Sequence, residues 1–237
     1  MTLYQNILTS VASNQKLLAI LIDPEKVTLE QLPHLISQIK NSPTTHILVG
    51  GSTFEGQNLD ELIMELKRLC HLPILLFPGG FQQISAAADG ILFLSLLSGR
   101  NPDYLIEHQV KSVPYLAKTE LEVIPTGYLL IESGKETAVA KVSQTQPLDR
   151  NDIEYVCQTA KAGEYLGNKL IYLEAGSGAE LAVPLAMIQK AKATLSVPLI
   201  VGGGIRSKEA IENAFDAGAD MVVIGTAFEN DNSFFNV

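Results

Sequence analysis

The chain has 237 residues, of which 46% are hydrophobic and 18% charged, and its 17 basic and 26 acidic residues give a net charge of −9. The length fits one domain, and the composition excludes a disordered chain. Nucleic acids are bound through clustered lysine and arginine side chains, and the sequence has no such cluster. We therefore expect no nucleic-acid partner.

The cysteines and the apolar runs indicate where the protein works. Cys70 and Cys157 are far apart and have no Cys-x-x-Cys spacing, which excludes a disulfide framework and argues against a zinc site. Met1–Ser13 has no charged start followed by an apolar segment, so we predict no signal peptide. The runs Leu17–Ile22 and Ile91–Leu97 are far shorter than the ~20 residues of a membrane span. These features predict a cytoplasmic protein.

Short apolar runs alternate with amphipathic segments along the chain. The runs that predict strands are Leu17–Ile22, His46–Val49, Pro73–Phe77, Gly90–Leu94, Glu122–Leu129, Leu170–Leu173, Pro198–Val201 and Met221–Ile224. Continuous apolar strands are typical of a parallel sheet that is covered on both faces. Eight such units predict an α/β fold, a (β/α)8 TIM barrel that forms a single domain over residues 1–237.

Two segments depart from a regular barrel. Between the third and fourth strands only Gln82–Ala88 could be helical, about two turns, so we expect the third helix to be missing or shortened. After the fifth strand, Ile131–Pro147 predicts either a long active-site loop or an extra hairpin. Helix starts are indicated by Thr28, by Asn101 to Asp103, and by Ser207.

Glycine and small hydroxyl residues follow several strands, at the barrel end where such enzymes carry their chemistry. Gly202 to Gly204 follow the seventh strand, and Gly225 and Thr226 follow the eighth. Glycines here let backbone N–H groups approach an anion at helix N-termini, which predicts a phosphate site. The alternative is that they only permit tight turns. Arg206 either neutralises the anion or forms a surface ion pair.

Two carboxylates end apolar strands. Asp23 follows the first strand, and together with the Ser52 hydroxyl it suits Mg²⁺, which takes most of its other ligands from substrate phosphates. The alternative is that Asp23 caps the turn at Pro24. Glu174 follows the sixth strand and is either a general base, a residue that orients a hydroxyl, or structural. Tyr172 lies on the same face of that strand.

Seven segments carry a resemblance that covers essentially the whole chain. They are Leu21–Lys26, Val49–Ser52, Leu76–Gly79, Leu92–Pro102, Pro125–Tyr128, Tyr172–Gly178 and Val201–Ile205. The fourth and sixth are the most specific, because generic phosphate-binding barrels have no reason to contain them. The set resembles the geranylgeranylglyceryl phosphate synthase family, in the form of its second group, which has archaeal and bacterial members.

The resemblance implies a prenyltransferase with a modified barrel. It would join the 3-hydroxyl of sn-glycerol 1-phosphate to a long-chain prenyl diphosphate, with geranylgeranyl diphosphate favoured, and release pyrophosphate in ether phospholipid biosynthesis. It implies that Asp23 and Ser52 hold Mg²⁺, and we expect Glu174 to accept the hydroxyl proton. The implied glycerol-phosphate residues are Tyr172, Leu173, Glu174, Ala175, Gly176, Ser177 and Gly178, with Gly203, Gly204, Gly225 and Thr226 at the phosphate.

Some features leave other interpretations open. Gly80-Phe81 departs from the family pattern beside the expected tail groove, and the chain has no tryptophan. The alternatives are a phosphosugar isomerase or lyase barrel, and a barrel that binds a phosphorylated ligand without turnover. Asp23, Ser52 and Glu174 together favour the prenyltransferase. None of the histidines is expected to be catalytic, and we expect a homo-oligomer with peripheral membrane contact.

Overall fold

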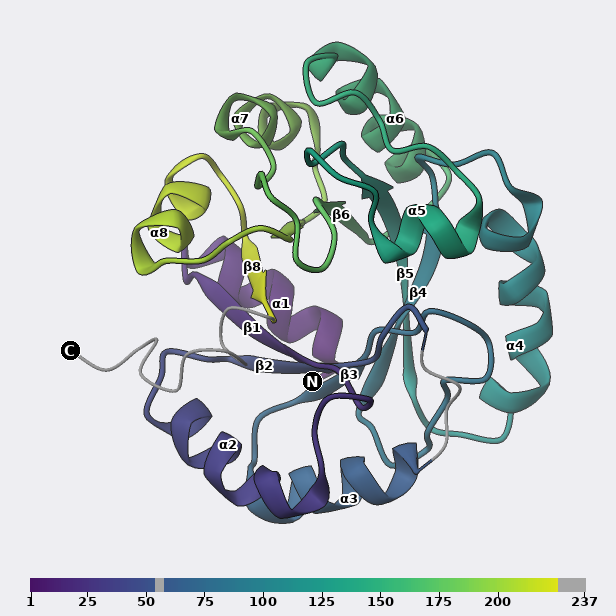
Figure 1. Cartoon of the computed structure of the whole chain (residues 1–237), viewed down its shortest axis with the longest axis vertical. Coiled ribbons are helices and arrows are strands. Elements are labelled where there is room, and N and C mark those ends of the chain that lie inside the picture. The colour runs from purple at the N-terminus through teal and green to yellow at the C-terminus, as the bar shows by residue number, and fades with distance from the viewer. Residues whose placement is uncertain (54–57, 226–237) are drawn as a thin grey trace.

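The computed structural model describes residues 1–53 and 58–225, and its strands close into one parallel barrel in sequence order (Figure 1). The strands are β1 (Leu17–Ile22), β2 (His46–Val49), β3 (Ile74–Leu76), β4 (Gly90–Leu96), β5 (Glu122–Leu130), β6 (Leu170–Glu174), β7 (Leu199–Gly202) and β8 (Met221–Ile224). Closure comes from β8 pairing with β1, where Leu17 lies opposite Met221. The predicted (β/α)8 barrel is confirmed.

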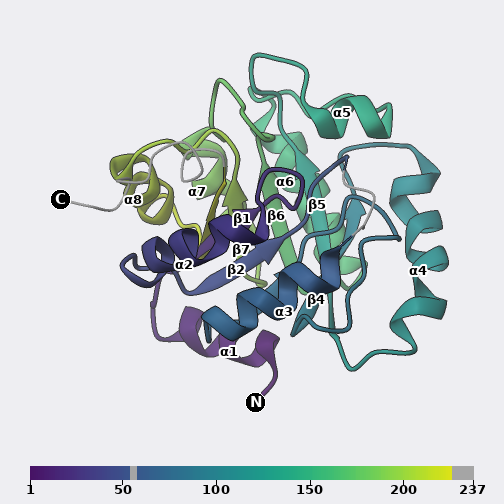
Figure 2. The same cartoon turned by 60° about the horizontal axis from the view of Figure 1, so that its bottom comes forward.

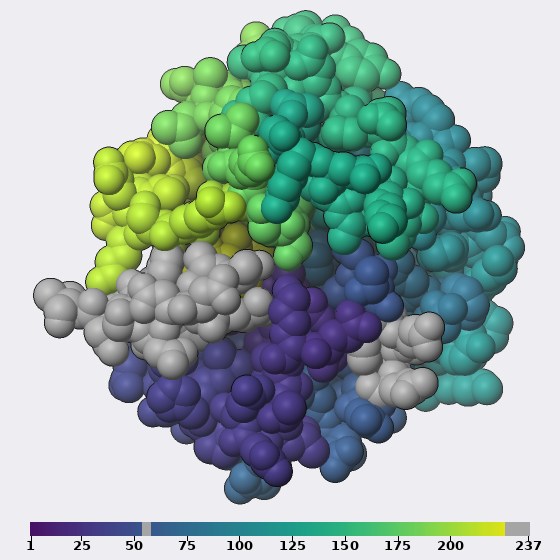
Figure 3. All heavy atoms as spheres, viewed as in Figure 1, coloured from purple at the N-terminus to yellow at the C-terminus, as the bar shows by residue number. Residues whose placement is uncertain are grey.

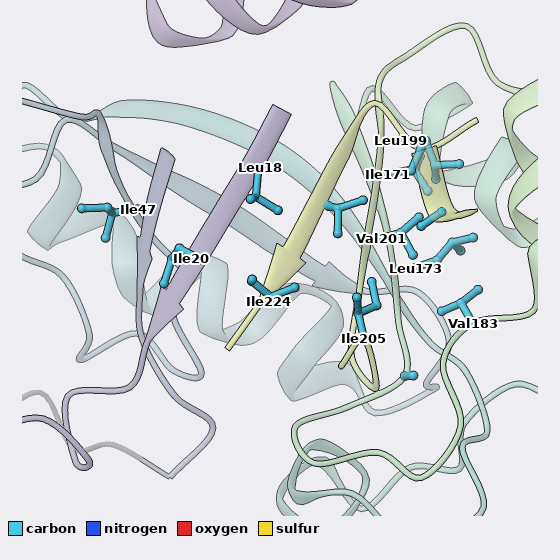
Figure 4. Packing of buried hydrophobic residues seen from close by; sticks show 14 of the residues in the cluster. Leu18, Ile20, Ile47, Ile171, Leu173, Val183, Leu199, Val201, Ile205 and Ile224 are labelled. Carbon is cyan, nitrogen blue, oxygen red and sulfur yellow. The ribbon is translucent and has the colours of Figure 1, made fainter. Parts of the chain in front are cut away.

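Both faces of the strands are buried, which explains the continuous apolar runs. In β6, Leu170 and Tyr172 belong to the cluster inside the barrel, while Ile171 and Leu173 belong to the cluster between the barrel and its helices. The alternation follows from the two-residue period of a strand. Figure 4 shows Leu173 close to Val183, another residue of the outer cluster.

Helices follow most strands and cover the outside of the barrel (Figure 1). They are α2 (Leu32–Lys40) after the 3-10 turn η1 (Leu29–Gln31), α3 (Leu59–Leu69), α4 (His108–Leu116) after the π-helical turn η2 (Asp103–Glu107), α6 (Ile153–Tyr165), α7 (Leu185–Thr194) and α8 (Lys208–Asp216). The predicted start at Ser207 is confirmed, because its hydroxyl accepts from the Ala210 N–H at 3.0 Å. No helix in the described part of the chain is long and apolar enough to span a membrane.

An N-terminal helix that the sequence analysis did not predict closes one end of the barrel. This helix, α1 (Leu3–Ala12), begins with a capping box between Thr2 and Gln5. Ile7 is 1% exposed and belongs to the inner cluster, and the Glu122 carboxylate accepts from the Tyr4 N–H at 3.0 Å. Figure 2 shows α1 at the opposite end of the barrel from α5 (Ala138–Ser143).

Both predicted irregularities begin at the carboxyl ends of strands, one after β3 and one after β5. Residues 77–89, all described, contain turns and no helix, so the third barrel helix is absent as expected. After β5 the chain forms a loop with the short helix α5, which Thr137 caps by accepting from the Ala140 N–H at 3.2 Å. The alternative of an extra hairpin is wrong, since Ile131 makes only an isolated parallel bridge with Leu148.

Candidate active site

A cavity of about 680 Å³ lies at the carboxyl ends of the strands. The predicted site residues that line it are Asp23, Ser52, Tyr172, Glu174, Gly176, Ser177, Gly178, Gly203, Gly204 and Gly225. Leu173 and Ala175 do not, because both side chains are fully buried in the outer cluster. Thr226 lies outside the described residues. The structure therefore brings most of the predicted residues to one cavity.

Glu174 is a buried carboxylate at the end of β6. It is 6% exposed, and its Oε1 accepts from the Gly176 N–H at 2.7 Å. Burial raises the pKa of the Glu174 carboxyl, against the opposing effects of the Tyr172 hydroxyl and the Gly176 N–H. A carboxylate with a raised pKa at a cavity wall is suited to accept a proton from a substrate hydroxyl.

The glycines after β7 let its loop lie directly on the loop after β6. Gly203 has φ +78°, and a Cβ there would lie 2.4 Å from Glu174 Oε1 and 2.6 Å from the Gly176 nitrogen. Gly204 has φ +70°, and its Cβ would lie 2.9 Å from the Ala182 nitrogen. Only glycine fits both positions. Their backbone is exposed to the cavity just before α8, in the arrangement expected of a phosphate site.

Arg206 braces these loops. Its Nη2 donates to the Ala179 carbonyl at 2.5 Å, and it lines the cavity. This hydrogen bond to a backbone carbonyl differs from the two contacts predicted for Arg206, which were an anion contact and a surface ion pair. The guanidinium joins the β7 loop to the β6 loop and keeps positive charge beside the glycines.

Asp23 and Ser52 line the cavity on its other side, after β1 and β2. Asp23 Oδ1 accepts from the Glu25 N–H at 3.1 Å, and Oδ2 lies 3.2 Å from Lys26 Nζ, so the carboxylate also caps its turn as the alternative predicted. Among the described residues no three His, Cys, Asp or Glu side chains could hold a metal ion together. One carboxylate and one hydroxyl fit a cation that takes its remaining ligands from substrate phosphates.

Aromatic rings form the floor of the cavity. The Tyr172 ring stacks on Phe77 and meets Tyr128 edge to face, with a centroid distance of 5.4 Å in each pair. The Tyr172 hydroxyl is buried beside the Glu174 carboxylate and acts against the raised pKa of that group. This hydroxyl can donate to a substrate oxygen or to the carboxylate.

An apolar groove continues from this floor toward α4, along the side where the third helix is absent. Phe81 meets His108 edge to face at 5.9 Å, and the Tyr104 ring lies 4.7 Å from His108. Ile84 and Leu94 also line it. The departure Gly80-Phe81 thus lies in the groove wall, as the sequence suggested. The sequence analysis did not place His108 at the site. Its spacing of four residues from Tyr104 indicates that the two side chains share one helix face, but it does not show that this face meets the cavity.

Lys135 is a further residue that the sequence did not single out. Its Nζ lies 3.4 Å from where a Cβ on Gly178 would stand. The segment that carries it runs beside the β6 loop, since the Leu181 N–H donates to the Ser133 carbonyl at 3.2 Å. Figure 3 shows the teal segment after β5 next to the green segment after β6. This positive charge therefore adjoins the predicted glycerol-binding loop.

Comparison with known proteins finds relatives over nearly the full chain. The chain is 58% identical over 235 residues to the geranylgeranylglyceryl phosphate synthase of Flavobacterium johnsoniae, covering 99% of this chain and 97% of the relative. It is 42% identical over 220 residues to the synthase of the same name from Thermococcus kodakarensis, covering 92% and 86%. The predicted resemblance to this family of bacterial and archaeal proteins is confirmed.

A solved structure has the same fold. It is (S)-3-O-geranylgeranylglyceryl phosphate synthase from Thermoplasma acidophilum in complex with substrate sn-glycerol-1-phosphate, which matches with a TM-score of 0.91 and 34% identity over 98% of this chain and 93% of that one. A wild-type synthase from Thermoplasma volcanium matches with a TM-score of 0.92 and 35% identity, over 100% of this chain and 94% of that one. The sequence model of the PcrB family matches residues 11–236, and the chain belongs to the PcrB family.

Proposed function

We propose that this chain is a prenyltransferase that makes an ether bond between the 3-hydroxyl of sn-glycerol 1-phosphate and a long-chain prenyl diphosphate, with geranylgeranyl diphosphate favoured. The observation that carries the proposal is that one cavity joins a glycine-lined polar half, with Glu174 in its wall, to an apolar aromatic groove. The relatives named as synthases and the related structure with sn-glycerol-1-phosphate bound support it.

The polar half would receive sn-glycerol 1-phosphate. The N–H groups around Gly203 and Gly204 approach its phosphate, and Arg206 and Lys135 supply positive charge nearby. The glycerol then extends toward Tyr172 and Glu174, whose polar ends lie beside Gly202. Holding the phosphate away from the reacting atom orients the 3-hydroxyl without obstructing it.

The reaction forms one bond and breaks one. The glycerol 3-oxygen bonds to the first prenyl carbon, the bond from that carbon to the diphosphate oxygen breaks, and Glu174 takes the hydroxyl proton. Mg²⁺ bound at Asp23 and Ser52 would neutralise negative charge that develops on the departing diphosphate. Lys26, whose ammonium lies 3.2 Å from Asp23 Oδ2, adds a positive charge on the same side.

The apolar groove would receive the prenyl tail. Phe77 and Tyr128 face the allylic end, and Phe81, Tyr104 and His108 lie farther along the wall. Their rings bury the tail with little loss of conformational freedom, because aromatic side chains have few rotatable bonds.

The decisive experiment offers the purified protein Mg²⁺, geranylgeranyl diphosphate and one glycerol phosphate enantiomer at a time, and detects the ether by mass spectrometry. We expect product from sn-glycerol 1-phosphate, none from the 3-phosphate, and none when the metal is removed with a chelator. Absence of ether with any prenyl chain length would overturn the proposal, and turnover in chelator would overturn the Mg²⁺ assignment.

We also propose a cytoplasmic homo-oligomer with peripheral membrane contact. Cys70 and Cys157 are both unpaired and buried, which fits a reducing compartment. One face of η2 and α4 is apolar and more than half exposed, with Ile106 at 58%, Val110 at 56% and Val113 at 55%. An exposed apolar face of this kind supports contact with another copy of the chain or with a membrane. Sedimentation of the protein alone measures its oligomeric state, and sedimentation with lipid vesicles measures its membrane contact.

A further inference from the structure

Gln83 is a buried amide in the segment that stands where the third barrel helix is absent. It is 3% exposed, and it bonds to two different loops. Its Nε2 donates to the Gly51 carbonyl at 2.8 Å, and its Oε1 accepts from the Gly79 N–H at 3.0 Å. One side chain thus joins the loop after β2 to the loop after β3.

The two loops that Gln83 joins are in direct contact. A Cβ on Gly79 would lie 2.5 Å from the Gly51 oxygen and 2.9 Å from Ser52 Cα. A Cβ on Gly51 would lie 2.9 Å from Asp23 Oδ1, so the same peptide also packs on the loop after β1. The position of the Gly51 peptide therefore fixes how Asp23 and Ser52 lie relative to each other.

We propose that Gln83 is a positioning residue for the half of the cavity that takes the cation and the diphosphate, an inference that rests on the proposed function. The site needs an amide because one bonded atom must donate and the other must accept. Without it, the part-buried Gly51 carbonyl and Gly79 N–H would lose these partners, and the loops that they join would be held less firmly together. With it, the loops hold Asp23 and Ser52 in place without a supporting helix.

The test measures binding, with inorganic pyrophosphate plus Mg²⁺ as one probe and sn-glycerol 1-phosphate as the other, by titration calorimetry. Gln83→Met keeps the length of the side chain and removes its hydrogen bonds to Gly51 and Gly79. We expect magnesium pyrophosphate to bind about tenfold more weakly and sn-glycerol 1-phosphate to bind as in the parent. In the transfer assay, KM for the prenyl diphosphate should rise by the same factor, with KM for glycerol phosphate unchanged.

Asn168→Leu is the matched control. Asn168 also uses its amide to hold a loop, since Nδ2 donates to the Gly163 carbonyl at 2.9 Å, but it lies before β6 at the other end of the barrel. Both probes should bind this variant as they bind the parent. If Gln83→Met does not fold, Gln83→Glu takes its place, because it keeps the oxygen that accepts from Gly79 and loses the donor to Gly51.

Each outcome decides the inference. Unchanged pyrophosphate affinity in the Gln83 variant overturns it, and so does an equal loss for both probes, which would mark a general structural role. A parent that binds no magnesium pyrophosphate overturns it together with the diphosphate site. A parent that binds the probe but makes no ether overturns only the proposed function, and the shift in pyrophosphate affinity then still decides the role of Gln83.

Discussion

The Glu174 carboxylate is buried, accepts a hydrogen bond from the Gly176 N–H and lies beside the Tyr172 hydroxyl. Burial raises its pKa above the ordinary value for glutamate, and the base must be ionised to accept a proton. Activity should therefore fall as the pH drops through this raised pKa, and the acidic limb of the rate profile should lie above pH 4.5.

Glu174→Gln tests this role, because it keeps the shape of the side chain and removes the base. We expect kcat to fall about 100-fold or more, KM for both substrates to change little, and the acidic limb to disappear. Steady-state kinetics between pH 5 and pH 9 measure all three. An unchanged kcat would remove Glu174 as the base and leave it a residue that orients the hydroxyl.

A substitution at Gly203 tests whether the loop after β7 binds the phosphate of sn-glycerol 1-phosphate. Gly203→Ala places a methyl group 2.4 Å from Glu174 Oε1 at φ +78°, so the β7 loop must move away from the β6 loop. We expect KM for sn-glycerol 1-phosphate to rise at least about tenfold, with KM for the prenyl diphosphate unchanged. Gly167→Ala is the control, since φ is +100° there but nothing lies within 4 Å. If both variants keep the parent KM, the phosphate binds elsewhere.

At the scale of elements, the sequence predicts the strands well and the site only in part. The inner and outer faces of each strand are both buried, so runs such as Leu17–Ile22 are recognisable without tertiary information. Gln83 and Lys135 could not be identified, because their contacts depend on which loops meet in space. The hairpin alternative for Ile131–Pro147 was wrong because apolar spacing in so short a segment does not separate strand from helix.

The helix α1 was missed because its face is only partly apolar and much of it stays exposed. Its role gives an element-scale prediction. Ile7→Ala leaves a hole at the end of the inner cluster and should lower the free energy of unfolding by about 2–5 kcal/mol. Leu8→Ala on the same helix, where the side chain is 38% exposed, should lower it far less. Urea denaturation compares the two, and equal losses would show that α1 does not seal the barrel.

In the whole molecule, the residues that seal the barrel and the residues that line the cavity lie at opposite ends. One end of the barrel is closed by α1, while at the other end the described loops that follow the strands surround the cavity. Ile7, which seals the first end, does not line the cavity, while the loops after β6 and β7 at the second end lie directly against each other. A ligand that joins several of these loops should therefore stabilise the whole barrel when it binds.

The glycerol phosphate enantiomers test this coupling without turnover. At 100 times its Kd, sn-glycerol 1-phosphate should stabilise the fold by about 2.7 kcal/mol, which thermal unfolding detects as a raised Tm that grows with ligand concentration. The 3-phosphate should raise Tm less, because its phosphate can occupy the glycine loops around Gly203 while its hydroxyls miss Tyr172 and Glu174. Gly203→Ala should reduce both shifts. Equal shifts for the two enantiomers would mean that the phosphate alone is recognised and that stereochemistry is selected only in the transfer step.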